Sequence, residues 1–145
     1  MRYVFSKLST KVFAVLLLVL PALTSCDKCK EEDKPSAREQ LVGKWIIKSF
    51  TIDGVEVIGS IVTSSKLELE SYSGNKGDFE WSIFYSDHTS ETQSGDYKVD
   101  EAEKEIDFED KIGEHQVFDY DLDGDDLELT GILDGERVEL KADRD

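Results

Sequence analysis

The sequence predicts an all-β fold and, within that class, an eight-stranded up-and-down antiparallel barrel. Eight stretches alternate apolar and polar residues with the period of two expected of half-buried strands. The segments between them are short and rich in turn-forming residues, and beyond residue 41 no helical period extends over several turns. Closing eight such strands into a barrel would remove the two exposed edges of an open sheet. A two-sheet sandwich and a strongly curved open sheet are the alternatives.

The first four strands are predicted over residues 44–52, 66–72, 79–85 and 91–99, after a short helical turn over residues 37–41. The first strand ends at the turn-forming pair Asp53-Gly54. The third strand, FEWSIFY, has the clearest pattern, because Phe79, Trp81 and Tyr85 share one face. These stretches supply one half of the predicted barrel.

The other four strands are predicted over residues 105–109, 116–122, 126–133 and 136–142. In the sixth strand Phe118, Tyr120 and Leu122 face one way, while the aspartates between them face the other. The intervening segments, of which Asp123-Gly124 and Asp134-Gly135 are typical, are tight and favour hairpins. Each strand should therefore pair with the next one along the chain.

The first 25 residues have the features of a secretory signal peptide rather than of a fold. Arg2, Lys7 and Lys11 form a positive start, and an unbroken apolar run of nine residues follows over residues 12–20. A membrane-spanning helix needs about 20 apolar residues, so this run is too short to be one. We expect residues 1–25 to be removed.

The end of the signal resembles the lipobox of bacterial lipoproteins, in the sequence Leu23-Thr24-Ser25-Cys26. The resemblance implies that Cys26 becomes the first residue of the mature chain and carries acyl chains such as palmitate. Several acyl chains on one residue would anchor the protein stably in a membrane, whereas one chain alone is marginal. A secreted protein without a lipid is the alternative.

Residues 26–36 are expected to form a flexible acidic tether, because the stretch CDKCKEEDKP has almost nothing apolar to bury. Within it, Lys30-Glu31-Glu32-Asp33 is similar to the export signal of Bacteroidetes-type lipoproteins. That similarity implies an outer-membrane lipoprotein exposed at the cell surface, and a periplasm-facing anchor is the alternative. Residues 37–145 then form the single folded domain.

The charge of the chain excludes two classes of partner. The formal net charge is −16, and removal of the three positive charges of the signal would make it −19. Such a domain is repelled by nucleic acid and by anionic lipid surfaces. Any contact with the membrane is therefore attributed to the N-terminal lipid alone.

The predicted barrel also resembles the small lipocalin-like domains of bacterial lipoproteins. Gly43-Lys44-Trp45 is similar to the G-x-W signature at the first lipocalin strand, and later hairpins over residues 95–108 and 120–129 support the resemblance, which extends over residues 41–141. The family implies a tryptophan that closes one barrel end beneath a basic side chain from the last strand. Arg137, Lys141 and Arg144 are the candidates for that basic residue.

Catalytic and metal chemistry find little support in the sequence. Cys26 and Cys29 have Cys-x-x-Cys spacing, but acylation would consume Cys26, and no helix start follows that could lower a thiol pKa. Zinc would need about four ligands, and the histidines, His88 and His115, lie far along the chain. We therefore expect no enzyme activity, no cofactor and no metal.

A possible calcium loop is explained better by a hairpin. Asp119, Asp121 and Asp123 match the first half of such a loop, but its twelfth position, which requires a glutamate, is Thr130. The same aspartates would lie on the outward face of a strand that ends at a tight turn.

Aromatic side chains are the remaining candidates for a binding site. The hypothetical ligand-lining residues, all expected inside the barrel, are Trp45, Phe79, Trp81, Tyr85, Tyr97, Phe108, Phe118 and Tyr120. An eight-stranded barrel is near the size at which side chains fill it or leave room for one small ligand, so plain core filling is the alternative. The apolar stretch at residues 55–62 corresponds to the lid over the open end of lipocalins, or else to an extra piece of strand.

The leading hypothesis is a non-enzymatic, membrane-anchored lipoprotein whose lipocalin-like barrel binds a small apolar or amphipathic molecule. The rival hypothesis is a filled barrel that acts as a protein-interaction module in a cell-envelope complex. The presence or absence of a cavity separates the two.

Overall fold

The structure is a computed structural model that describes residues 35–145. The predicted signal peptide, both cysteines and the predicted tether as far as Lys34 lie outside the described residues. The predictions for lipidation and export therefore rest on the sequence.

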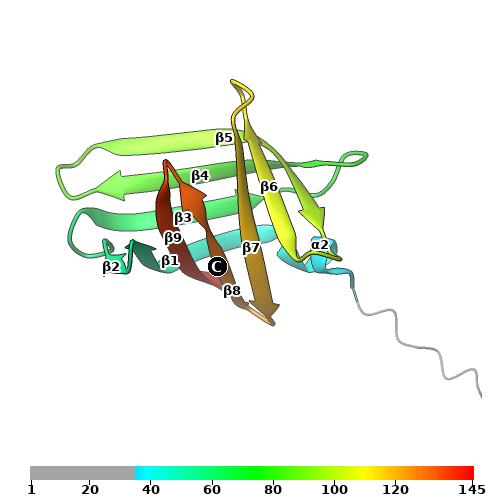
Figure 1. Cartoon of the computed structure of the whole chain (residues 1–145), viewed down its shortest axis with the longest axis horizontal. Helices are drawn as coiled ribbons and strands as arrows, with labels where there is room; N and C mark the ends of the chain where they lie inside the picture. The colour runs from blue at the N-terminus through cyan, green and yellow to red at the C-terminus, as the bar shows by residue number, and fades with distance from the viewer. Residues whose placement is uncertain (1–34) are drawn as a thin grey trace, which may run out of the picture. The chain divides into compact units, whose positions relative to one another are not determined.

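The described chain contains one short helix and nine strands (Figure 1). They are α2 (Ala37–Leu41), β1 (Gly43–Ile52), β2 (Val55–Glu56), β3 (Val62–Leu69), β4 (Gly77–Tyr85), β5 (Ser90–Asp100), β6 (Glu105–Asp110), β7 (His115–Asp123), β8 (Asp126–Leu133) and β9 (Glu136–Arg144).

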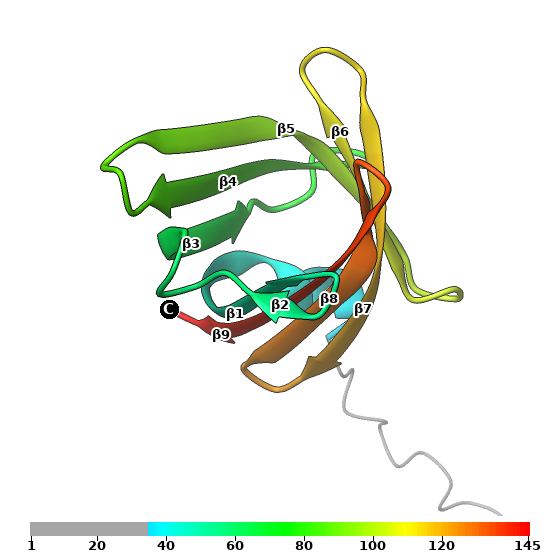
Figure 2. The ribbon, with the colours of Figure 1, turned by 60° about the vertical axis from the view of Figure 1, so that its left-hand side comes forward.

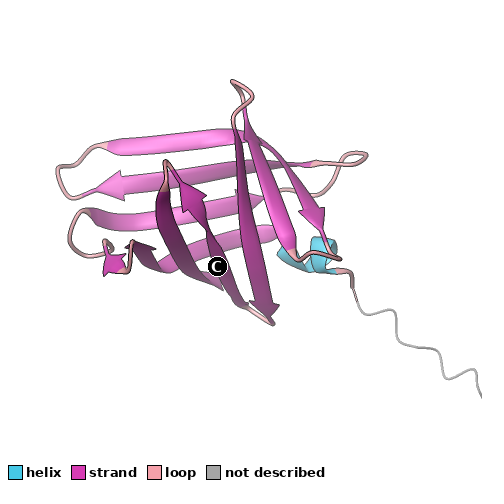
Figure 3. Cartoon of the chain, in the orientation of Figure 1, coloured by secondary structure: helices cyan, strands magenta, loops and turns pink. Residues whose placement is uncertain are grey.

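The strands form a closed antiparallel barrel. Neighbours in the sheet follow the order β2-β1-β3-β4-β5-β6-β7-β8-β9, and β9 also pairs with β1, which closes a ring of eight strands with β2 as a two-residue addition (Figures 2 and 3). The β1–β9 ladder extends from Trp45↔Arg144 to Ile52↔Val138. The predicted eight-stranded up-and-down barrel is confirmed.

The inward faces of the strands form one apolar core. Trp45, Tyr97 and Phe118 are fully buried, and aromatic rings contact one another across the barrel. Phe108, for example, lies edge-on to both Phe79 and Phe118, with ring centroids 4.9 and 5.9 Å apart. Such offset contacts add to the stabilisation that burial alone provides.

The second long strand differs from its sequence prediction. It covers Val62–Leu69 rather than residues 66–72, because the polar stretch Thr63-Ser64-Ser65 is part of the strand. Ser65 is fully buried, and its Oγ accepts a hydrogen bond of 2.8 Å from Trp81 Nε1. A buried hydroxyl with such a partner is tolerated in a core, but the partner comes from another strand and is not visible in the local sequence pattern.

One end of the barrel is covered by α2. Ser36 and Glu39 form a capping box at the start of this helix, and the fully buried Leu41 at its end belongs to the core. The helix and the turns at residues 101–104 and 124–125 lie at this end, which is called the closed end below.

At the opposite end the barrel wall separates around one hairpin. Gly95↔Asp110 is the last β5–β6 pair, although β5 continues to pair with β4 as far as Ser90↔Phe84. Phe118↔Gly131 is likewise the last β7–β8 pair, although β8 and β9 pair up to Leu133↔Glu136. The tip of the β6–β7 hairpin, residues 111–117, therefore pairs neither with β5 on one side nor with β8 on the other (Figures 1 and 2).

Gly95 lies where the separation of β5 from β6 begins. A Cβ atom at this position would lie 2.0 Å from the carbonyl oxygen of Glu109, so only glycine allows β5 to approach β6 so closely. Glycine within a strand commonly marks such a close approach. Beyond Gly95, β5 diverges from the hairpin and leaves an opening in the wall.

Candidate functional site

A cavity of about 520 Å³ lies at this open end of the barrel. The residues that line it come from β1, the β1–β3 connection, the start of β3, β4, β5, the β6–β7 hairpin, the end of β8 and the β8–β9 turn. They are Phe50, Ile52, Val57, Ile61, Val62, Trp81, Ile83, Tyr85, Glu91, Thr92, Gln93, Asp110, Glu114, Gln116, Leu133 and Asp134. The site is therefore assembled from segments far apart in the sequence.

The inner wall of the cavity is apolar. Phe50, Val57 and Val62 are each at most 5% exposed, and the ring of Trp81 packs at 43° to that of Phe50 with centroids 6.1 Å apart. The indole nitrogen of Trp81 already donates to Ser65. Trp81 thus presents apolar surface to the cavity without an unpaired donor.

The segment between β1 and β3 contributes a wall held in place by Glu56. The Glu56 carboxylate accepts hydrogen bonds from Ser49 Oγ and from the backbone amides of Phe50 (3.0 Å) and Ile58 (2.8 Å). Burial alone would raise the pKa of Glu56, but these hydrogen bonds outweigh it and hold the pKa below its usual range. This clamp fixes Val57 at the edge of the cavity.

The rim of the cavity is polar and acidic. The Tyr85 hydroxyl donates a hydrogen bond of 2.9 Å to Glu91 Oε2. Partial burial raises the pKa of Tyr85, and the hydrogen bond and charge of Glu91, together with the charge of Asp87, raise it further. Negative charge is therefore concentrated where β4 and β5 reach the open end.

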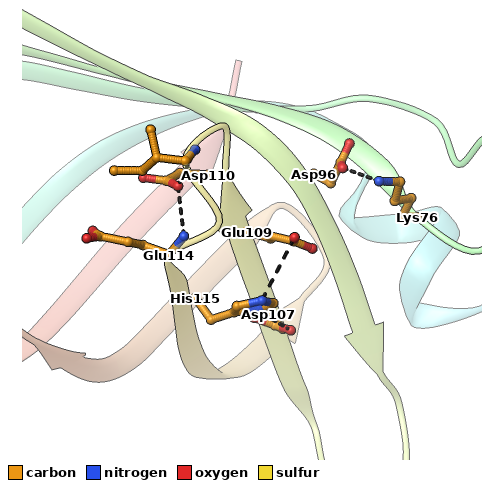
Figure 4. Close-up of polar contacts among 8 residues, drawn as sticks. Lys76, Asp96, Asp107, Glu109, Asp110, Glu114 and His115 are labelled. Carbon is orange, nitrogen blue, oxygen red and sulfur yellow. Dashed lines mark hydrogen bonds and ion pairs between the residues drawn. The ribbon is translucent and has the colours of Figure 1, made fainter.

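Asp110 fixes the turn on the other side of the rim. Its Oδ1 accepts hydrogen bonds of 2.9 Å from the backbone amides of Ile112 and Glu114 (Figure 4). The Asp110 amide in turn donates to the Glu114 carbonyl oxygen at 3.0 Å. This arrangement holds the Glu114 side chain at the mouth although the tip of the hairpin lacks neighbouring strands.

The structure separates the eight predicted lining residues into two groups. Trp81 and Tyr85 line the cavity. The other six fill the core below it: Trp45, Phe79, Tyr97, Phe108, Phe118 and Tyr120. Residues that the sequence reasoning did not propose include Phe50 and Ile52, whose position at the end of the first strand is the signal that could have identified them.

The closed end is sealed by Trp45 and Arg144. The guanidinium carbon of Arg144 lies 4.3 Å from the centre of the Trp45 ring, and Nη1 donates to the Val42 carbonyl oxygen at 2.9 Å. Nη2 donates to the carbonyl oxygen of Gln40, and Nε contacts Asp125 at 3.1 Å. Of the three basic candidates, Arg144 is the one that covers the tryptophan.

Gly43, the glycine of the G-x-W motif, makes room for this contact. Its φ of +143° lies where side chains are rarely accommodated, and a Cβ atom here would lie 2.7 Å from Nη1 of Arg144. The spacing of Gly43 and Trp45 thus serves the closed end and not the cavity.

The remaining polar candidates lie away from the cavity. His115 Nδ1 is 3.0 Å from Asp107 Oδ1 in an exposed group that includes Glu109, and Lys76 pairs with Asp96 nearby (Figure 4). His88 lies in the β4–β5 turn. Within residues 35–145 no group of three or more His, Cys, Asp or Glu side chains, the group around His115 included, is arranged so that it could hold a metal ion.

The aspartates of the suspected calcium motif lie on the outer face of a β-hairpin strand, as the alternative interpretation predicted. Asp119, Asp121 and Asp123 are exposed on β7, and Asp121 pairs with Lys104 at 3.3 Å. Asp123 pairs with Asp126 in the register of the β7–β8 hairpin.

None of the helices in the described part of the chain is long and apolar enough to cross a bilayer.

Comparisons with known proteins support the fold. No protein-family model and no curated protein matches the chain. Among solved structures, the chain is similar to a de novo designed fluorescence-activating β-barrel, with a TM-score of 0.57 and 16% sequence identity over 77% of this chain and 100% of the designed one. At this identity the likeness concerns the fold, which is that of an eight-stranded antiparallel β-barrel.

Proposed function

We propose that the chain is a non-enzymatic lipoprotein whose lipocalin-like barrel binds one small apolar or amphipathic molecule at its open end. The observation that carries this proposal is the cavity of about 520 Å³ with an apolar inner wall. Small-molecule sites are typically concave, of about 300 to 1,000 Å³, and mainly apolar with a few polar groups that orient the ligand. The cavity fits this description in size and in lining.

The arrangement of the two barrel ends is consistent with this function. Arg144 and Trp45 seal the closed end, and Phe79, Tyr97, Phe108, Phe118 and Tyr120 fill the core next to it. The free space lies instead at the end where the strands diverge. A ligand could enter there without disturbing the core.

A fluorescence titration tests ligand binding directly. The designed barrel to which the chain is similar is described as fluorescence-activating, so a dye is a natural probe. N-phenyl-1-naphthylamine is neutral and becomes bright in apolar surroundings, and we expect its emission to rise saturably on addition of the protein.

A matched pair of variants locates the binding site of the dye. Ile83→Trp adds bulk inside the cavity, whereas Ile132→Trp adds the same bulk at an exposed position outside the lining. We expect Ile83→Trp to weaken dye binding about tenfold or more, because the added ring occupies space in which the dye would bury apolar surface. Equal affinities in the two variants, with both folded by circular dichroism, would contradict the proposal, as would a wild-type protein that binds no dye.

The lipid anchor is a separate part of the proposal and rests on the residues around Cys26. Growth with labelled palmitate should mark the wild-type protein and Cys29→Ala but not Cys26→Ala. Label that persists in Cys26→Ala would reject acylation at this residue.

Outer-membrane surface exposure rests on the similarity of residues 30–33 to an export signal. Protease added to intact cells should then cleave the protein. If the protein is cut only after lysis, the anchor faces the periplasm instead.

A further inference from the structure

The charged residues of the cavity all have the same sign. Glu91, Asp110, Glu114 and Asp134 line it, whereas none of its lining residues is Lys, Arg or His. These four residues come from β5, the β6–β7 hairpin and the β8–β9 turn, so they approach the mouth from different sides. The apolar cavity is therefore bordered by carboxylates without a cation among them.

Seven Lys and Arg residues of the described chain form ion pairs away from the cavity, and the other four, Arg38, Lys66, Lys98 and Lys111, do not line it. Lys44 pairs with Glu68, Lys48 with Asp143, Lys76 with Asp96, Lys104 with Asp121, Arg137 with Glu139 and Lys141 with Glu128. Arg144 is held at the closed end. Lys111 follows the rim residue Asp110 in the sequence and lines, together with it, a separate groove beside β5 and β6 rather than the cavity.

The carboxylates at the rim are only partly compensated. Glu91 accepts a hydrogen bond from the Tyr85 hydroxyl, and Asp110 accepts two from backbone amides. Among the contacts within residues 35–145, the carboxylates of Glu114 and Asp134 form no ion pair. A cleft lined by one sign of charge beside low-dielectric walls concentrates ions of the opposite sign.

We propose that the ligand of this cavity is a cationic amphiphile, with an ammonium-type head among the rim carboxylates and an apolar body against Trp81, Val57 and Val62. The inference rests on the proposed function, since it specifies the charge of the molecule that the barrel binds. At the rim the head keeps part of its hydration while the body is buried, as long cationic side chains do at protein surfaces. An amphiphile with a carboxylate or phosphate head is repelled at the same position.

One aromatic side chain at the rim favours the same ligand class. Tyr85 lines the cavity on the β4 side, and its hydroxyl is hydrogen-bonded to Glu91 on β5. The faces of such rings attract organic cations, most strongly when the cation is partly desolvated. A quaternary ammonium head can use this ring as well as the carboxylates, because it has no N–H group that needs a specific acceptor.

Three probes with the same ten-carbon chain separate charge from apolar burial. Decyltrimethylammonium and decanoate below their micelle-forming concentrations, and decanol below its solubility limit, would compete with N-phenyl-1-naphthylamine for the wild-type protein. We expect the cation to compete about tenfold better than the alcohol, and the anion to compete worse than either, because the rim carboxylates attract the cation and repel the anion. Screening by water and salt limits the size of this effect. The preference should shrink when the salt concentration is raised.

Charge-neutral variants locate the effect. Glu91→Gln combined with Glu114→Gln should remove most of the preference for the cation over decanol, while the glutamine amide oxygen at position 91 can still accept a hydrogen bond from Tyr85. Glu103→Gln removes a charge from the exposed β5–β6 turn at the closed end and is the matched control.

The outcomes distinguish this inference from the proposed function. Equal competition by the three probes, tightest competition by decanoate, or a preference that survives in the double variant would overturn the cationic ligand while the binding function stands. If neither the dye nor any of the three probes binds, the proposed function itself fails.

Discussion

Replacing Arg144 with leucine should destabilise the barrel more than replacing any other Lys or Arg residue of the domain with leucine. Arg144 donates to the carbonyl oxygens of Val42 and Gln40 and covers the ring of Trp45 at 4.3 Å. Leucine keeps part of the apolar stem but provides none of these donors and no charge. The closed end would therefore lose its cover while its backbone stays in place.

The expected cost follows from these contacts. Hydrogen bonds from a charged donor contribute about 1.5 to 3 kcal/mol each, and a partly exposed cation over an aromatic ring about 1 kcal/mol. The contact with Asp125, whose side chain is 84% exposed, adds little. Because the freed carbonyl groups can bind water, we take the low end of these ranges and expect a loss of about 3 kcal/mol, which corresponds to about 15 °C in Tm for a domain of this size.

Urea denaturation followed by tryptophan fluorescence and circular dichroism would measure this loss. Arg137→Leu on the same strand is the matched control, since Arg137 forms an exposed pair with Glu139 that is worth at most about 1 kcal/mol. Arg144→Lys should lie between the two, because lysine keeps the charge but lacks the planar fork whose two nitrogens reach Val42 and Gln40 separately. An Arg144→Leu variant as stable as Arg137→Leu would refute the role assigned to Arg144.

Three further predictions concern the wall, the lid segment and the core. Gly95→Val should destabilise the barrel by about 2 kcal/mol or more in urea denaturation, because its Cβ would lie 2.0 Å from the Glu109 carbonyl oxygen; an unchanged unfolding free energy would count against the close approach. The Ile58 amide donates to the Glu56 carboxylate, so its hydrogen exchange, corrected for intrinsic rates, should be slow above the usual pKa of a glutamate and should become faster as the pH falls through the lowered pKa of Glu56. Glu56→Gln should lose this pH dependence. If the exchange rate in Glu56→Gln still depends on pH in the same way, Glu56 does not fix this segment. Burial raises the pKa of Tyr97 far above 10, so its contribution to the free energy of unfolding should be complete below about pH 10 and should fall above it by about 1.4 kcal/mol per pH unit. The free energy of unfolding of Tyr97→Phe should fall less steeply in this range, and equal slopes would contradict the effect of burial.

Much of the fold could be predicted from the sequence because strand alternation is a local property. The period of two in residues 79–85 identifies both the strand and its inward face, on which Phe79 and Trp81 are buried and Ile83 and Tyr85 are half-buried. The start of β3 could not be predicted in this way. Its residues 63–65 are polar, and Ser65 is accommodated in the core only because Trp81 of the next strand donates to it.

The candidate site was harder to predict because alternation does not give depth along the barrel. Phe79 and Trp81 share a face of β4, yet Phe79 lies in the core and Trp81 reaches the cavity. Depth depends on how far each strand is shifted against its neighbours, which is a property of the whole sheet. The aromatic residues could therefore be assigned to the interior but not divided between core and cavity.

The choice of Arg144 was within reach of the sequence. Val138, Leu140 and Ala142 are the inward residues of β9, and Arg144 continues this even-numbered series, whereas Arg137 and Lys141 belong to the outward series. Parity alone would have separated the three candidates. The charge of the rim, by contrast, is formed by Glu91, Glu114 and Asp134 from three separate turns or strands, and only the folded chain brings them to one mouth.

The most direct test of the account is a methyl-resolved NMR titration of the protein with decanol. If the open-end cavity is the binding site, the methyl signals of Val57, Val62 and Leu133 should shift together and saturate, while those of Leu41, Leu69 and Ala142 near the closed end should stay in place. Shifts confined to the exposed Ile112 and Ile132, or an absence of saturable shifts, would show that the cavity does not hold a ligand.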